Sequence, residues 1–128
     1  MESNTLKSIW FMEGLSSQRD IIMAVIDARQ SFDLSFRIIA SHRGNRPEIT
    51  SVADLSLVEP KGDTERLEFI KSVVAKENVI TIQAGRNCRW MEENRREIEA
   101  LGVSLTTGAS SLDMHSIADD KVHYAHFM

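Results

Sequence analysis

The sequence predicts a three-layer α/β/α fold with a mainly parallel sheet of five strands. Short apolar runs of strand length alternate with longer segments whose apolar residues recur at helical spacing. The length of 128 residues and a hydrophobic content of 42% suffice for one domain with an apolar core. Strands that alternate with helices form parallel sheets through right-handed crossovers, with helices on both faces.

The first half of the chain contains three expected strands. Residues 6–12 form the first, and a turn at 13–16 leads into a helix that Ser17 would cap, with Asp20 three residues on. Ile21, Ile22, Val25 and Ile26 form the sheet-facing side of that helix, which ends at residues 31–33. Residues 35–40 form the second strand, residues 41–47 a polar loop and residues 54–59 the third strand.

The second half continues the alternation. A helix begins at Asp63 or Thr64 and presents Leu67, Ile70, Val73 and Val74 inward. A buried strand is expected at 79–82 because of its β-branched run, followed by a loop at 85–89, a helix at 90–101 that ends before Gly102, and a strand at 103–106. Residues 110–117 would form one or two helical turns, and Asp119 opens a last helix. This order of elements is Rossmann-like.

Composition excludes several classes of partner. The net charge of −4 comes from well-mixed acids and bases, so no basic field for nucleic acid or an anionic membrane surface is expected. The single cysteine, Cys88, cannot form an internal disulfide, which favours a reducing compartment. No apolar run approaches the roughly 20 residues that span a bilayer, and residues 1–5 lack the basic start and apolar run of a signal peptide, so none is expected. The expected location is cytoplasmic.

Two runs of residues resemble the N-terminal pre-ATP-grasp domain of the ATP-grasp ligases, such as biotin carboxylase and the carbamoyl-phosphate synthase large chain. Residues 98–110, Ile-Glu-Ala-Leu-Gly-Val-Ser-Leu-Thr-Thr-Gly-Ala-Ser, are similar to the end of that domain, and Asp120-Lys121 to the pair that opens the ATP-grasp domain. Residues 9–17, Ile-Trp-Phe-Met-Glu-Gly-Leu-Ser-Ser, resemble the first strand and loop of one subgroup. The likeness covers nearly the whole chain, and the order and spacing of the motifs carry it.

The resemblance implies that the chain spans one domain and the beginning of another. Residues 1–109 would be the substrate-side domain, and residues 110–128 would lead into an ATP-grasp domain that continues beyond Met128. Such ligases join a carboxylate to an amine or thiol through an acylphosphate, with ATP and magnesium held between the later lobes. Lys121 matches the family's basic residue that contacts ATP phosphate, where a compact ammonium is suitable. The chain alone is expected to bind no cofactor and to be inactive.

Three loops should meet at the carboxyl ends of the strands, where open parallel sheets bind ligands. In the first, Gly14 permits close backbone approach, and Ser16 and Ser17 precede the free amides of a helix. A plain capped turn is the alternative. In the other two loops, Arg43, Arg86 and Arg89 are candidates for binding a substrate carboxylate or phosphate, because guanidinium groups bind such anions in pairs of hydrogen bonds.

Together with Arg46, these arginines would form a positively charged rim around the site if their loops converge. The alternative is that they are solvated surface arginines. Cys88 is expected to be a partly buried, inert thiol rather than a nucleophile. His123 and His126 have no second cluster to complete a metal site, so no metal is expected in this chain.

Two other functions compete with the ligase domain. A free-standing Rossmann-like module for a nucleotide or another anion would use the same loops without Lys121. A receiver-like regulatory domain is less suitable, since no acidic pair follows the first strand. The partners expected are a small-molecule carboxylate and a downstream ATP-grasp domain. Val122, Tyr124 and Phe127 would leave apolar surface near the C-terminus that is compatible with a homodimer.

Overall fold

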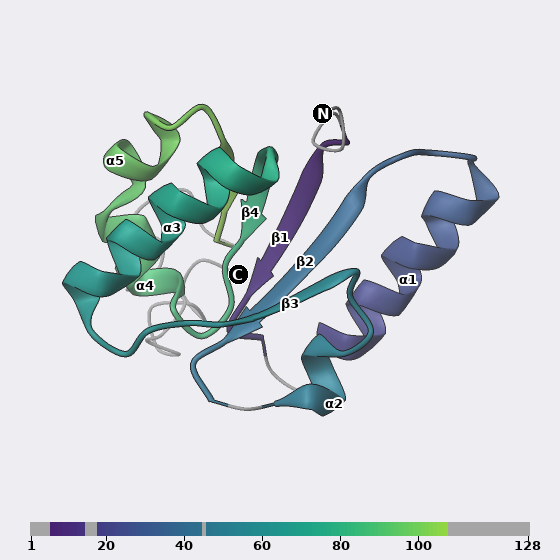
Figure 1. Cartoon of the computed structure of the whole chain (residues 1–128), viewed down its shortest axis with the longest axis horizontal. Coiled ribbons are helices and arrows are strands. Elements are labelled where there is room, and N and C mark those ends of the chain that lie inside the picture. The colour runs from purple at the N-terminus through teal and green to yellow at the C-terminus, as the bar shows by residue number, and fades with distance from the viewer. Residues whose placement is uncertain (1–5, 15–17, 45, 108–128) are drawn as a thin grey trace, which may run out of the picture.

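A computed structural model describes residues 6–14, 18–44 and 46–107 of the chain. Its strands are Ser8–Met12 (β1), Arg37–His42 (β2), Leu55–Val58 (β3), Val79–Gln83 (β4) and Ser104–Thr106 (β5). They form one all-parallel sheet in the order β3-β2-β1-β4-β5 (Figure 1). The strand order reverses between β1 and β4, and the predicted Rossmann-like α/β fold is confirmed.

Helices cover both faces of the sheet. They are Gln18–Ser31 (α1), Pro47–Thr50 (α2), Asp63–Glu77 (α3), Cys88–Glu93 (α4) and Arg95–Glu99 (α5). Figure 1 shows α1 and α2 on one face and α3, α4 and α5 on the other. Within the described ranges, no helix is both long and apolar enough to cross a membrane.

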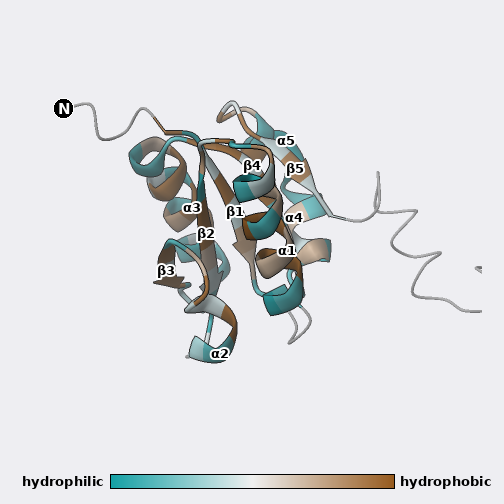
Figure 2. Cartoon of the chain, turned by 90° about the vertical axis from the view of Figure 1, so that its right-hand side faces the viewer, coloured by the Kyte–Doolittle hydropathy of each residue, from teal (hydrophilic) through white to brown (hydrophobic). Residues whose placement is uncertain are grey.

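The central strands are buried from both sides, because successive side chains point to opposite faces. On β1, Trp10 and Met12 join the larger core beneath α3, α4 and α5. Phe11 points the other way and packs with Ile38 of β2 and Ile22 of α1 in the smaller core. Figure 2 shows hydrophobic residues along these strands, and Figure 1 shows the strands between the two helical layers.

The structure corrects the predicted boundaries around β2. Ser41 and His42, predicted to lie in a loop, are buried residues of this strand. The strand continues because β2 pairs with β1 on one edge and with β3 on the other as far as these residues. The short helix α2 was not predicted from the sequence, although Pro47 occupies its first turn and Ile49 is fully buried.

The predicted continuous helix over 90–101 is also wrong, since α4 and α5 meet at Asn94. The Asn94 side-chain amide donates to the Trp90 carbonyl at 2.9 Å, and its backbone N–H is shared between the carbonyls of Met91 at 3.1 Å and Trp90 at 3.2 Å. Local hydrogen bonds of this kind compete with helix continuation. Gly102 follows α5 with φ 94°, a backbone conformation that glycine adopts at little cost.

β4 is less buried than its β-branched sequence predicts. Val79 and Ile82 belong to the larger core, but Ile80, which stands where the register between β1 and β4 shifts, is 41% exposed. The core beneath α1 is built on side chains of β1 and β2, and Ile80 lies outside it.

Candidate functional site at the carboxyl end of the sheet

A cleft of about 420 Å³ lies at the carboxyl ends of β1 and β4, where the strand order reverses. Phe11 and Ile21 contribute apolar surface, Gly14 and Gly85 contribute backbone, and the exposed Arg86 contributes a cation. Ligands of open parallel sheets bind in this position, because loops diverge there and leave a crevice.

The two loops that form the cleft are packed tightly against each other. A Cβ atom added to Gly85 would lie 2.2 Å from the Glu13 carbonyl oxygen and 2.3 Å from that of Met12. A Cβ atom on Gly14 would lie 2.0 Å from Cδ of Gln18, a residue that is 5% exposed. Neither position accommodates a side chain without displacement of its neighbour.

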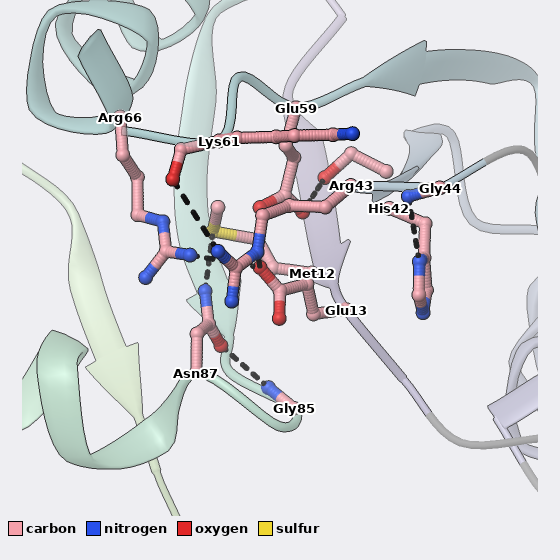
Figure 3. Close-up of polar contacts among 11 residues, drawn as sticks. Met12, Glu13, His42, Arg43, Gly44, Glu59, Lys61, Arg66, Gly85 and Asn87 are labelled. Carbon is pink, nitrogen blue, oxygen red and sulfur yellow. Dashed lines mark hydrogen bonds and ion pairs between the residues drawn. The ribbon is translucent and has the colours of Figure 1, made fainter. Parts of the chain in front are cut away.

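Glu13 connects this cleft to a buried group of charges (Figure 3). Its backbone lies in the left-handed region with φ 41°, and its side chain is 4% exposed. Oε2 of Glu13 accepts hydrogen bonds from Nε of Arg43 at 3.0 Å and from Nη2 of Arg66 at 3.1 Å. Its backbone carbonyl accepts the N–H of Arg86 at 2.8 Å.

Arg66 is the buried cation of this group and comes from the first turn of α3. Its side chain is 3% exposed, and its guanidinium lies over the ring of Trp90, 4.8 Å from the centroid. A desolvated cation over an indole face is a favourable arrangement. Nε of Arg66 has no hydrogen-bond partner, so the Glu13 carboxylate is the main compensation for its charge.

A second buried carboxyl group, Glu59, lies beside Glu13. Ser41 accepts a hydrogen bond from Nε1 of Trp10 and donates one to Oε2 of Glu59, each at 2.7 Å. Burial raises the pKa of Glu59 to about 7; the Ser41 hydroxyl opposes this rise, and the Glu13 carboxylate adds to it. A proton on Oε1, which otherwise has no partner, would let Glu59 donate toward Glu13.

The structure brings some predicted site residues together and separates others. Gly14 and Arg86 line the same cleft. Arg43 and Arg86 both contact Glu13, Arg43 through its side chain and Arg86 through its backbone N–H, but Arg43 does not line the cleft. The side chain of Arg43 is thus engaged by an acid within the chain.

The remaining predicted residues lie elsewhere. Arg46 forms an ion pair with Glu48, and Arg89 is an exposed residue of α4 that does not line the cleft. Ser16, Ser17 and Lys121 lie outside the described residues.

Sequence reasoning missed Gln18, Glu59 and Arg66 as members of this region. It included Glu13 in the first candidate loop but gave its side chain no role. For Arg66 a signal exists, because it precedes Ile70 and Val73 by four and seven residues, which places all three on the inner face of α3. Nothing in the local sequence around Glu59 indicates that its carboxyl group is buried.

The described residues show no site for a metal ion. Within residues 6–14, 18–44 and 46–107, no three His, Cys, Asp or Glu side chains gather closely enough to hold one. Cys88, the single cysteine of the chain, stands at the start of α4 and is half-buried.

The strand order separates this fold from one of the alternatives. Receiver domains have the order 2-1-3-4-5, whereas this sheet has the order 3-2-1-4-5 of nucleotide-binding Rossmann folds. In comparisons with known protein families and with curated proteins, no family and no protein matches the chain.

Proposed function

We propose that this chain is the substrate-side domain of an ATP-grasp carboxylate–amine or carboxylate–thiol ligase, and that its cleft holds the small carboxylate substrate. The observation that carries the proposal is the cleft at the reversal of strand order, with Arg86 as its cation. The resemblance of residues 9–17 and 98–110 to pre-ATP-grasp domains supplies the choice of reaction.

The residues of the cleft suit a molecule with an anionic end and a hydrocarbon part. Arg86 can bind a carboxylate through two parallel hydrogen bonds, while Phe11 and Ile21 offer apolar surface to the rest of the substrate. The role of this domain is to bind and orient the acid.

ATP would supply the phosphoryl group that activates the acid. By the resemblance, Lys121 and residues beyond Met128 hold ATP and magnesium, so the described part of the chain has no catalytic role of its own. The partner for this function is the downstream ATP-grasp domain.

The cleft assignment is tested by titration of the ¹⁵N-labelled chain with small mono- and dicarboxylic acids, including amino acids. We expect amide shifts at Gly14, Gly85 and Arg86, and a loss of affinity of at least about tenfold in Arg86→Ala, because this variant lacks both charge-assisted hydrogen bonds to the carboxylate. Arg96→Ala, which removes an exposed arginine of α5, is the matched control. Shifts confined to other surfaces, or equal affinities of the two variants, would contradict the assignment.

A second candidate is a free-standing Rossmann-like module that binds a nucleotide. The same observation favours it, because nucleotides bind where the order 3-2-1-4-5 reverses. This candidate requires ATP or a related nucleotide to bind the 128-residue chain itself. The ligase domain requires the substrate acid to bind there instead.

A further inference from the structure

We propose that Glu13 is a positioning residue, whose ion pairs with Arg66 and Arg43 fix the wall of the cleft that Gly85 and Arg86 form. The consequence for ligand binding rests on the proposed function of the cleft, whereas the positioning itself does not. The basis is a continuous path of contacts from α3 through the end of β1 to the loop after β4.

The path begins with an unusual backbone conformation. Glu13 has φ 41°, in the left-handed region that glycine, asparagine and aspartate visit more readily than glutamate. A glutamate keeps this conformation only where surrounding contacts impose it. Its conformation decides where its carbonyl group points, and that carbonyl is the acceptor for the Arg86 N–H at 2.8 Å.

The contacts that impose it come from three separate elements. The backbone N–H of Glu13 donates to the Ser41 carbonyl of β2 at 2.9 Å. Its side chain receives Arg66 from α3 and Arg43 from the loop after β2 (Figure 3). Since the side-chain carboxylate is 4% exposed, water cannot replace these donors.

The loop after β4, which contains Gly85 and Arg86, packs directly against Glu13. Gly85 leaves no room between its backbone and the carbonyls of Glu13 and Met12, so a movement of Glu13 must move this loop. The Asn87 side chain accepts the Gly85 N–H at 3.0 Å and contacts Sδ of Met12 at 3.8 Å, which keeps the loop in one shape. Arg86 lies between Gly85 and Asn87 in this loop. The position of Glu13 therefore determines the position of Arg86.

Amide hydrogen exchange of the ¹⁵N-labelled chain tests this positioning without any ligand. In Glu13→Gln and Arg43→Gln we expect the Arg86 amide to exchange about tenfold faster, because its acceptor is no longer held in place. The Ala84 amide, which donates to the Thr106 carbonyl at 2.9 Å in the same loop region, is the internal reference and should change by less than about twofold. Glu77→Gln, which breaks the ion pair with Arg37, is the matched control for loss of a partly buried charge.

Two results would overturn the proposal: an unchanged Arg86 rate in both variants, or an equal acceleration of Arg86 and Ala84, which indicates general loosening. Arg43→Gln decides the question if Glu13→Gln does not fold, because the Arg43 side chain is 43% exposed and its loss is tolerable. Titration with inorganic phosphate measures the consequence for anion binding. We expect a lower affinity for phosphate in Arg43→Gln than in Glu77→Gln. If the unaltered chain binds neither phosphate nor any carboxylate, the proposed function fails, while the exchange rates still decide the role of Glu13.

Discussion

At the scale of single residues, the carboxyl group of Glu59 has the most unusual environment. It is 2% exposed, and Ser41 is its only hydrogen-bond donor within the described part of the chain. Its raised pKa of about 7 means that the folded protein holds a proton that the unfolded chain releases near pH 4.5.

This environment predicts that stability falls as pH rises. Protonated Glu59 stabilises the fold fully below its unfolded pKa, and the contribution is lost as pH rises through about 7. We expect a decrease in unfolding free energy of roughly 2–3 kcal/mol between pH 4.5 and pH 8 from this group. Urea unfolding of the chain and of Glu59→Gln at several pH values measures it.

Glu59→Gln should lose this decrease and be more stable than the unaltered chain at pH 8, since a neutral amide resembles the protonated acid. Every other ionisable group is common to both proteins, so the difference between the two curves isolates Glu59. Glu65→Gln, at an exposed position of α3, is the control and should follow the unaltered chain. Parallel curves for the chain and Glu59→Gln would refute the buried-proton interpretation.

Single residues also mark the limit of sequence reasoning. Gly14 and Arg86 could be placed at one edge because strand ends are predictable from apolar runs. The ion pair between Glu13 and Arg43 could not be predicted, since the two residues are thirty positions apart and only the pairing of β1 with β2 brings them together.

At the scale of elements, one arginine holds α4 and α5 to the end of the sheet. Nε and Nη2 of Arg95 contact the two carboxylate oxygens of Glu92 at 2.6 and 2.9 Å. Its Nη1 donates to Glu99 at 2.7 Å and to the Leu105 carbonyl of β5 at 3.1 Å. Helices of this length are not stable alone, so tertiary contacts must hold them.

Arg95→Met should therefore destabilise the chain by about 2 kcal/mol, because the Glu92 carboxylate, 4% exposed, loses its cation. Lys71→Met is a matched control, since its pair with Glu68 spans 4.0 Å between exposed side chains. The control should change the unfolding free energy by less than about 0.5 kcal/mol. Thermal or urea unfolding of both variants checks this, and equal effects would contradict the role of Arg95 as a clamp.

The elements themselves were predictable where periodicity was strong. The spacing of Ile70 and Val73 indicates α3, and the apolar run that includes Trp10 indicates β1. The break at Asn94 was not predictable, because the residues on both sides of it favour a helix. The hydrogen bonds that Asn94 makes to Trp90 are visible only in the structure.

At the scale of the whole molecule, the alternation of strands and helices was enough to predict the fold, because parallel strands joined by right-handed crossovers have few possible topologies. The order of strands decides where ligands can bind, and it does so through chain geometry rather than through any local motif. The cleft between β1 and β4 follows from that order, while the identity of its ligand depends on the few side chains that line it.

The most direct test of the ligase assignment is calorimetry with ATP and magnesium. Two proteins are titrated under the same conditions: this 128-residue chain and the longer protein that the proposal requires, in which an ATP-grasp domain follows the chain. A domain on the substrate side of an ATP-grasp ligase predicts heat of binding from the longer protein and none from the chain. Comparable binding by the chain alone would contradict that assignment and favour the free-standing nucleotide module.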